Sequence, residues 1–324
     1  MIDGIDTPYR ISISAGRTHD AQVRKKLKFA TFWHGDALSP YEWMCLKSFR
    51  AKHDDVFFVS YDDKVSVPEG IQVINANEVC DKALLDKFIY HGKPSLAGFT
   101  DYFRYRLIQK HEVCWFDADM MCLSPDESIF NDFIFGFEHE LSINNAILKL
   151  PRNHGALLEL IKTCEENIGK DLEWGALGPI LLTRILTNAK LRERAQPKEK
   201  FYPFGVVNFW QLLLPIYRDK VINETQNSWS VHLWNELYKQ IGNWKHICPP
   251  EGSFLHWKAK ELDCLDRFIA IYPEPLIYNV VESWIANYER KIQMSEEIAT
   301  LKQAIMDMKE GKAQSPDYSD FRSY

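Results

Sequence analysis

The start of the chain alternates between apolar runs and an amphipathic segment, and this order constrains the fold more than any other feature. Residues 27–33 read LKFATFW and residues 56–61 read VFFVSY, and both are rich in the β-branched and aromatic residues that favour strands. Between them, Ser39, Pro40 and Glu42 predict a helix start, with a capping serine, a proline in the first turn and a glutamate completing a capping box. Strand, helix and strand in this order predict a parallel sheet with helices on its faces.

Similar alternation continues along the chain. A helix expected at 99–110 leads into an apolar strand at 112–117, which reads as a central, buried strand. The region 200–280 is irregular and rich in Trp, Pro and His. The other expected elements are strands at 70–74, 132–138 and 143–150 and helices at 154–168 and 179–189.

We expect one main domain with smaller segments at its ends. The predicted segments are a polar leader at 1–25, an α/β domain at 26–282, a C-terminal helix at 283–310 and a disordered tail at 311–324. Within the C-terminal helix, apolar residues recur at four-three spacing, which suits packing on the same chain or a dimer. The repeat consists of Met294, Ile298, Leu301, Ile305 and Met308.

Composition excludes several classes of protein. The net charge is −6, so the chain lacks the basic balance of a nucleic-acid-binding domain. Seven cysteines, odd in number and without a C-x-x-C pair, indicate free thiols in a reducing compartment rather than a zinc ribbon. We see neither a signal peptide nor an apolar stretch that could span a membrane. The expected location is therefore the cytoplasm, with peripheral membrane contact left open.

Two aspartates, Asp117 and Asp119, directly follow the apolar strand at 112–117 in the sequence CWFDADMMCL. Ligands of open α/β sheets bind beyond the carboxyl ends of the strands, and residues two apart in an extended chain point the same way. Both carboxylates can therefore face one Mg²⁺ or Mn²⁺ ion, whose other positions suit a diphosphate. Alone, an Asp-x-Asp pair is more often a loop with exposed acids.

The preceding helix changes this interpretation, because Asp101 and Arg104 share one of its faces. The segment FTDYFRYRLIQKHEVCWFDADMMCL resembles glycosyltransferases with the DXD sugar-binding region. These include α-1,4-galactosyltransferase-like and mannosyltransferase-like enzymes and the catalytic domain of clostridial glucosylating toxins. The resemblance implies a GT-A type, Rossmann-like domain with a mixed, mostly parallel sheet. It also implies that Asp101 and Arg104 bind the donor hexose, that Asp117 approaches the donor and that Asp119 binds the metal.

Further segments are similar to this family. By resemblance, Trp33 stacks on the nucleotide base, and Asn144 and Asn145 lie near the active centre. A late loop containing His232 and Trp234 closes on donor and metal, with His232 as the third metal ligand or a diphosphate contact and Trp234 as a lid residue. The sequence departs from the family pattern at Asp36, where many members have Gly, and at Leu177, where they have Thr.

Each of these residues also has a purely structural interpretation. Asp101 and Arg104 can form an ordinary ion pair on a helix surface, which contributes little stability. Trp33 can be a core aromatic residue, the two asparagines can cap or turn the chain, and a lone histidine is more often structural than a ligand. These alternatives stay open at the level of the sequence.

The predicted activity is metal-dependent transfer of a hexose from a nucleoside-diphosphate sugar, most simply a UDP-hexose, to an acceptor hydroxyl. The catalytic candidates are Asp117, Asp119 and Arg104. The resemblance implies retention of configuration and suggests bacterial surface-glycan synthesis. The alternatives are a protein-modifying, toxin-like transferase and a non-catalytic nucleotide-sugar-binding protein. An Asp-x-Asp phosphatase fits poorly because Met121 replaces the Thr or Val of its motif and because the motif lies far from the first strand. A P-loop enzyme or a Rossmann dehydrogenase needs a glycine-rich phosphate loop, which the sequence lacks.

Overall fold

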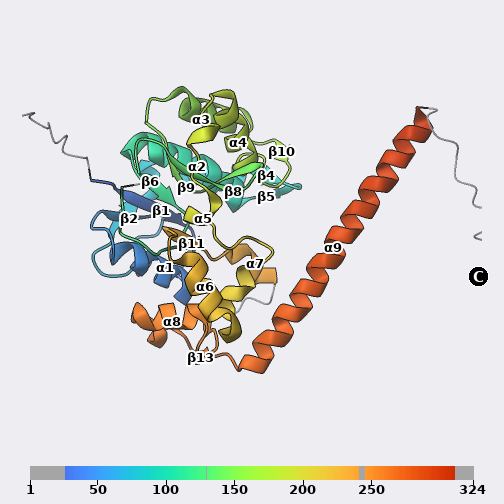
Figure 1. Cartoon of the computed structure of the whole chain (residues 1–324). Coiled ribbons are helices and arrows are strands. Elements are labelled where there is room, and N and C mark those ends of the chain that lie inside the picture. Colours follow the sequence, from blue (N-terminus) through green and yellow to red (C-terminus); the bar gives the residue numbers. More distant parts are fainter. Residues whose placement is uncertain (1–25, 129, 241–244, 311–324) are drawn as a thin grey trace, which may run out of the picture.

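The computed structural model describes residues 26–128, 130–240 and 245–310, so the predicted leader 1–25 and tail 311–324 lie outside it. The described chain forms a layered α/β body from which one long helix, α9 (Glu274–Lys309), projects (Figure 1).

The centre of the body is a six-stranded sheet with the strand order β3-β2-β1-β6-β9-β8. Four neighbouring strands, β3, β2, β1 and β6, run parallel, whereas β9 is antiparallel to both β6 and β8. The sheet is therefore mixed and mostly parallel, which confirms that part of the fold prediction. Its strands are β1 (Phe29–Trp33), β2 (Val56–Ser60), β3 (Gln72–Asn75), β6 (Cys114–Phe116), β8 (Ile134–His139) and β9 (Ser142–Lys149).

Helices flank this sheet, as the strand sequences require. Successive side chains of β1 point to opposite faces: Phe29 joins the apolar cluster that contains α1, whereas Ala30 and Phe32 join the cluster formed with α2, α3 and α4. A parallel sheet whose strands are apolar on both faces needs cover on both sides. The four helices are α1 (Pro40–Arg50), α2 (Leu96–His111), α3 (Gly155–Glu166) and α4 (Pro179–Asn188).

The predicted start of α1 is confirmed. Pro40 is its first residue, and the backbone N–H of Ser39 donates a 2.9 Å hydrogen bond to Oε2 of Glu42. The strand predicted at 112–117 is shorter, because the chain turns after Phe116 and starts a separate strand, β7 (Met120–Cys122).

The region between residues 200 and 280, predicted to be irregular, is organised around a second apolar core. Phe209, Phe254 and Trp284 pack there together with Tyr41 and Trp43 from α1. Its elements are short, which explains why periodicity did not reveal them. They include α5 (Lys198–Phe201), α6 (Arg218–Thr225), β11 (Ser230–His232), α7 (Asn235–Gln240), β12 (Ile247–Cys248), α8 (Phe254–Glu261) and β13 (Ala270–Ile271).

Three further short strands, which the sequence did not suggest, form a small sheet in the order β10-β4-β5. They are β4 (Ile89–Tyr90), β5 (Lys93–Pro94) and β10 (Asp171–Leu172).

The C-terminal helix begins earlier than the predicted boundary at residue 283. It starts at Glu274, with Pro275 in the first turn, where a proline is well tolerated. Ile277, Val281 and Trp284 are buried against the second core. The boundary was misplaced because these apolar residues belong at once to the helix and to the core of the domain.

All seven cysteines are buried with free thiols, in agreement with the free thiols expected from their number and spacing. None of the helices in the described ranges combines the length and the apolar character that crossing a membrane requires.

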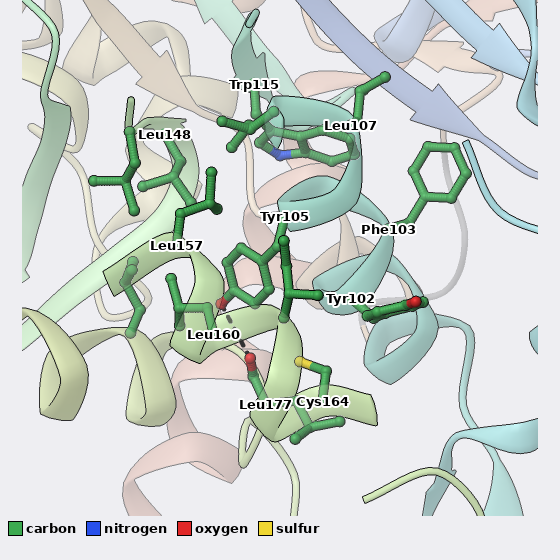
Figure 2. Packing of buried hydrophobic residues seen from close by; sticks show 14 of the residues in the cluster. Tyr102, Phe103, Tyr105, Leu107, Trp115, Leu148, Leu157, Leu160, Cys164 and Leu177 are labelled. Carbon is green, nitrogen blue, oxygen red and sulfur yellow. Dashed lines mark hydrogen bonds between the residues drawn. The ribbon is translucent and has the colours of Figure 1, made fainter. Parts of the chain in front are cut away.

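Two neighbouring leucines on α3 test the assignment of the core. Leu157 is fully buried in the cluster shown in Figure 2, whereas Leu158 is 43% exposed. We expect Leu157→Ala to lower the free energy of unfolding by about 2–5 kcal/mol, because it leaves a cavity, and Leu158→Ala to lower it by less than about 1 kcal/mol. Urea denaturation measures both variants. Equal losses would contradict the assignment of the faces of α3.

Candidate functional site

The candidate site lies at the carboxyl end of β6, where the order of the central sheet changes direction. From β1 the chain crosses to β2 on one side, and it later returns to place β6 on the other side of β1. Open α/β sheets bind ligands outside such a switch point. Asp117 and Asp119 directly follow β6, so the sheet itself places them there.

The two aspartates lie on a tight turn rather than on extended chain, which corrects the geometry expected from the sequence. The N–H of Asp117 donates to the carbonyl of Ala146 at 2.8 Å, and the N–H of Met120 donates back to the carbonyl of Asp117 at 2.9 Å. These bonds tie the turn to β9 and to the start of β7. The backbone that carries the carboxylates is therefore held on both sides.

His232 joins the pair because β11 and β7 form an antiparallel ladder in which His232 is opposite Met120. Its Nε2 lies 3.2 Å from Oδ1 of Asp119. One ligand atom from each of Asp117, Asp119 and His232 lies within 4.8 Å of the other two. Beyond the strand, the N–H of Leu233 donates to the carbonyl of Asp119 at 3.0 Å, and the N–H of Asn235 donates to Asp119 Oδ2 at 2.8 Å.

Behind this cluster, α2 supplies Arg104 as a buried cation shared between two carboxylates. Its Nη1 donates to Asp117 Oδ1 at 2.9 Å and to the carbonyl of Asn145 at 2.6 Å, and its Nη2 lies 3.3 Å from Asp101 Oδ1. Asn145 Nδ2 donates to the same Asp101 oxygen at 2.8 Å. Trp115 Nε1 donates to Asp117 Oδ1 at 2.6 Å. Asp101 and Arg104 are buried, which excludes the interpretation as a surface ion pair.

The pKa values reflect burial and crowding of negative charge. Burial raises the pKa of Asp101 to about 6, although Arg104 and Asn145 act in the opposite direction. Burial also raises the pKa of Asp117, and the charge of Asp119 adds to this shift. For Asp119 burial alone would raise the pKa, but His232 and the N–H of Asn235 lower it to about 2. For His232 burial would lower the pKa, but the carboxylates of Asp119 and Asp117 raise it.

These residues fit a divalent cation. Asp101 and Asp117 share the guanidinium of Arg104, and Asp119 pairs only with His232, so the three carboxylates outnumber the one permanent cation. Two carboxylates and an imidazole are ligands that Mn²⁺ accepts, and Mg²⁺ favours the carboxylates. His232 Nδ1 is buried without a hydrogen-bond partner. The neighbouring carboxylates favour the protonated form of His232, but a metal ligand has to be deprotonated. A cation and a proton would therefore compete for the imidazole.

Two further residues predicted for the site have other contacts. Asn144 links β9 to β8: its Nδ2 donates to Glu138 at 2.9 Å, and its Oδ1 accepts from the N–H of Ala146 at 2.7 Å. A role for Asn144 in donor binding stays a prediction. Trp33 ends β1, and Lys245 Nζ lies 5.9 Å from the centre of its ring. The role of Trp33 in base stacking stays a prediction.

The resemblance implied that His232 and Trp234 lie on one loop, and the structure corrects this in part. His232 lies in strand β11, and only Trp234 follows the strand. Trp234 has a φ of 59°, an uncommon left-handed conformation for a bulky residue. Its ring centre lies 4.1 Å from that of His232, and its Nε1 donates to the carbonyl of Phe204 at 2.8 Å. The segment therefore holds the imidazole in place, and a lid role for Trp234 stays a prediction.

Sequence reasoning missed several residues that support the site. Glu42, read only as part of a capping box, is fully buried and accepts hydrogen bonds from Asn235 Nδ2 and Lys245 Nζ. It thereby fixes the residue whose N–H contacts Asp119. Gly178 lies against Asp101, where a Cβ atom would stand 2.7 Å from Oδ2. The pairing of a glutamate with residues about two hundred positions away leaves no local signal.

Comparisons with known proteins add little. No protein-family model matches the chain, and no curated protein matches it. Among solved structures, one titled PaToxG Glycosyltransferase aligns with a TM-score of 0.35 and 13% identity, covering 52% of this chain and 75% of that chain. A similarity of this size establishes neither a shared fold nor a shared activity, so the site has to be interpreted from its own residues.

Removal of one ligand tests the metal site. We expect Asp119→Asn to weaken Mn²⁺ binding by at least about 10-fold, since even residues that only support metal ligands contribute 10- to 100-fold. Isothermal titration calorimetry measures the affinity. Asp126→Asn, at an exposed aspartate outside the cluster, is the matched control and should bind like the wild type. Unchanged affinity in Asp119→Asn would contradict the assignment.

A glycine substitution tests how tightly Asp101 is held. The new methyl group of Gly178→Ala would overlap a carboxylate that Arg104 and Asn145 fix in place. We expect the free energy of unfolding to fall by about 1–3 kcal/mol. Gly155→Ala meets nothing within 4 Å and should change the stability by less than about 1 kcal/mol. Equal effects in guanidinium denaturation would show that Asp101 can move freely.

Proposed function

We propose that the chain is a metal-dependent glycosyltransferase of the GT-A type that moves a hexose from a nucleoside-diphosphate sugar to an acceptor hydroxyl. The observation that carries this proposal is the cluster of Asp117, Asp119 and His232 at the switch point of the sheet. The buried pair of Asp101 and Arg104 directly behind the cluster supports it. The sequence resemblance to DXD glycosyltransferases includes all five residues, and its specific part is the unit with Asp101, Arg104, Asp117 and Asp119.

Asp117, Asp119 and His232 would hold the cation, Mn²⁺ or Mg²⁺. When bound, the cation supplies Lewis-acid stabilisation of the charge that develops on the departing diphosphate. Arg104 orients Asp117 and partly offsets its charge, because its Nη1 is already bonded to that carboxylate. Arg104 is therefore proposed to position Asp117 rather than to grip the sugar. Asp101 and Asn145 in turn fix the guanidinium.

The nucleotide would lie beside the end of β1. Trp33 is half-buried there, with Lys245 Nζ over its ring, although this ammonium group is also paired with Glu42. A flat aromatic surface suits a base. This arrangement favours a nucleotide sugar over a phosphate ester without a base. A UDP-hexose donor, retention of configuration and a surface-glycan acceptor are the finer parts of the proposal, and a protein acceptor is the alternative.

A screen of nucleoside-diphosphate hexoses tests the activity. We expect Mn²⁺-dependent hydrolysis of at least one donor in the absence of an acceptor. A coupled assay measures the nucleoside diphosphate that this hydrolysis releases. Because metal stabilisation contributes several kcal/mol, Asp119→Asn should lower the turnover by roughly 100-fold or more. Asp126→Asn should leave it unchanged. Binding of a donor without turnover would instead identify a non-catalytic nucleotide-sugar-binding protein. Full activity of Asp119→Asn would refute the proposed role of the cluster.

A further inference from the structure

The outer half of α9 stands away from the rest of the molecule. The helix projects away from the body (Figure 1). It packs on the body through Ile277, Val281 and Trp284, and from about residue 289 onward almost every side chain is exposed. An isolated helix gains little stability from its own hydrogen bonds in water, and most helices in proteins depend on packing of an apolar face. Over some twenty residues beyond its last core contact, this helix has no such packing within the described chain, and a partner on its apolar side would stabilise it.

An unpartnered apolar stripe runs along this outer half. Met294, Ile298, Leu301 and Ile305 are 50%, 48%, 62% and 47% exposed, and Met308 continues the series. Their spacing of four, three, four and three residues is that of a coiled-coil seam. At 100° per residue, the stripe is rotated by roughly 110° from the residues that pack on the body. It is therefore a separate surface and not an extension of the domain core.

We propose that two copies of this chain pair through this stripe as a parallel, two-stranded coiled coil. Ile298 and Ile305 occupy one core position of the repeat, and Leu301 occupies the other between the two methionines. In parallel coiled coils, isoleucine at the first position with leucine at the second favours two strands over three or four. The flanking charges are complementary in that arrangement. Glu297 directly precedes the seam residue Ile298, and Lys302 directly follows the seam residue Leu301. In a parallel pair, each Glu297 therefore lies beside Lys302 of the second copy.

The charges of the outer helix favour a second copy over a lipid surface. Between residues 289 and 310, four basic and five acidic side chains are mixed along the sequence. A helix that lies on an anionic membrane carries an excess of Lys and Arg on its polar face. The outer half of α9 lacks such an excess. This inference is independent of the proposed function, because no residue of the stripe belongs to the candidate site.

Sedimentation equilibrium of the full chain across a concentration series tests the pairing. The wild type is expected to be a dimer that dissociates on dilution, and Ile298→Glu with Ile305→Glu should be monomeric. The matched control, Ile292→Glu with Met306→Glu, makes the same change at exposed apolar residues off the stripe and should remain dimeric. Both pairs of changes lie away from the body, so its thermal unfolding should not change. A monomeric wild type, or equal dissociation of both variants, would overturn the proposal.

Charge reversal and cross-linking test the parallel arrangement. Glu297→Lys should raise the dimer dissociation constant by at least about 2-fold, and adding Lys302→Glu should restore it. Leu301→Cys should form a disulfide between copies under mild oxidation, whereas Gln303→Cys, on the outer side, should not. The seven native thiols are buried and give little background. A dimer without this cross-link would refute the parallel register. A monomer that co-sediments with phosphatidylglycerol vesicles would refute pairing altogether.

Discussion

One buried guanidinium beside three carboxylates, of which Asp101 is buried and Asp117 and Asp119 are partly buried, governs the chemistry of this molecule. Arg104 contacts Asp101 and Asp117, and Asp119 relies on His232 instead. Charges are costly to bury unless they are paired, and breaking a buried ion pair typically costs 3–5 kcal/mol. A cluster with excess negative charge is therefore retained at the expense of stability. The simplest physical reason is that a cation completes it. Without the cation, the carboxylates of Asp119 and Asp117 raise the pKa of His232 against the effect of its burial.

The fold supplies this cluster from four separate parts of the chain. The turn after β6 carries the two aspartates, α2 carries the arginine, β9 carries Asn145 and β11 carries His232. Each part is tied down independently. The ladder between β7 and β11 fixes His232, and Glu42, at the start of α1, holds Asn235 beside Asp119. This support by backbone and buried side chains is what a metal site requires, because ligands need fixed orientations to bind one ion.

Sequence patterns predicted the layered α/β body well because most of its strands and helices are long enough for the spacing of their apolar residues to be recognised. The start of α1 followed from Ser39, Pro40 and Glu42. The spacing of Asp101 and Arg104 placed both on one helix face, but only the resemblance linked them to Asp117, and the contact of Arg104 with that carboxylate was not predicted. The turn between β6 and β7 was missed because both strands have only three residues. The contact from Glu42 to Asn235 was missed because tertiary packing alone creates it. His232 was found only through resemblance, since β11 is equally short.

The most direct measurement is the affinity of the protein for UDP with and without Mn²⁺, determined by calorimetry. If Asp117, Asp119 and His232 hold a cation that in turn binds the diphosphate, UDP binds with Mn²⁺ and at least about 10-fold more weakly with a chelator. Asp119→Asn should then bind UDP weakly in both conditions. Equal affinity with and without Mn²⁺, or no binding of any nucleoside diphosphate, would contradict a metal-dependent nucleotide-sugar site.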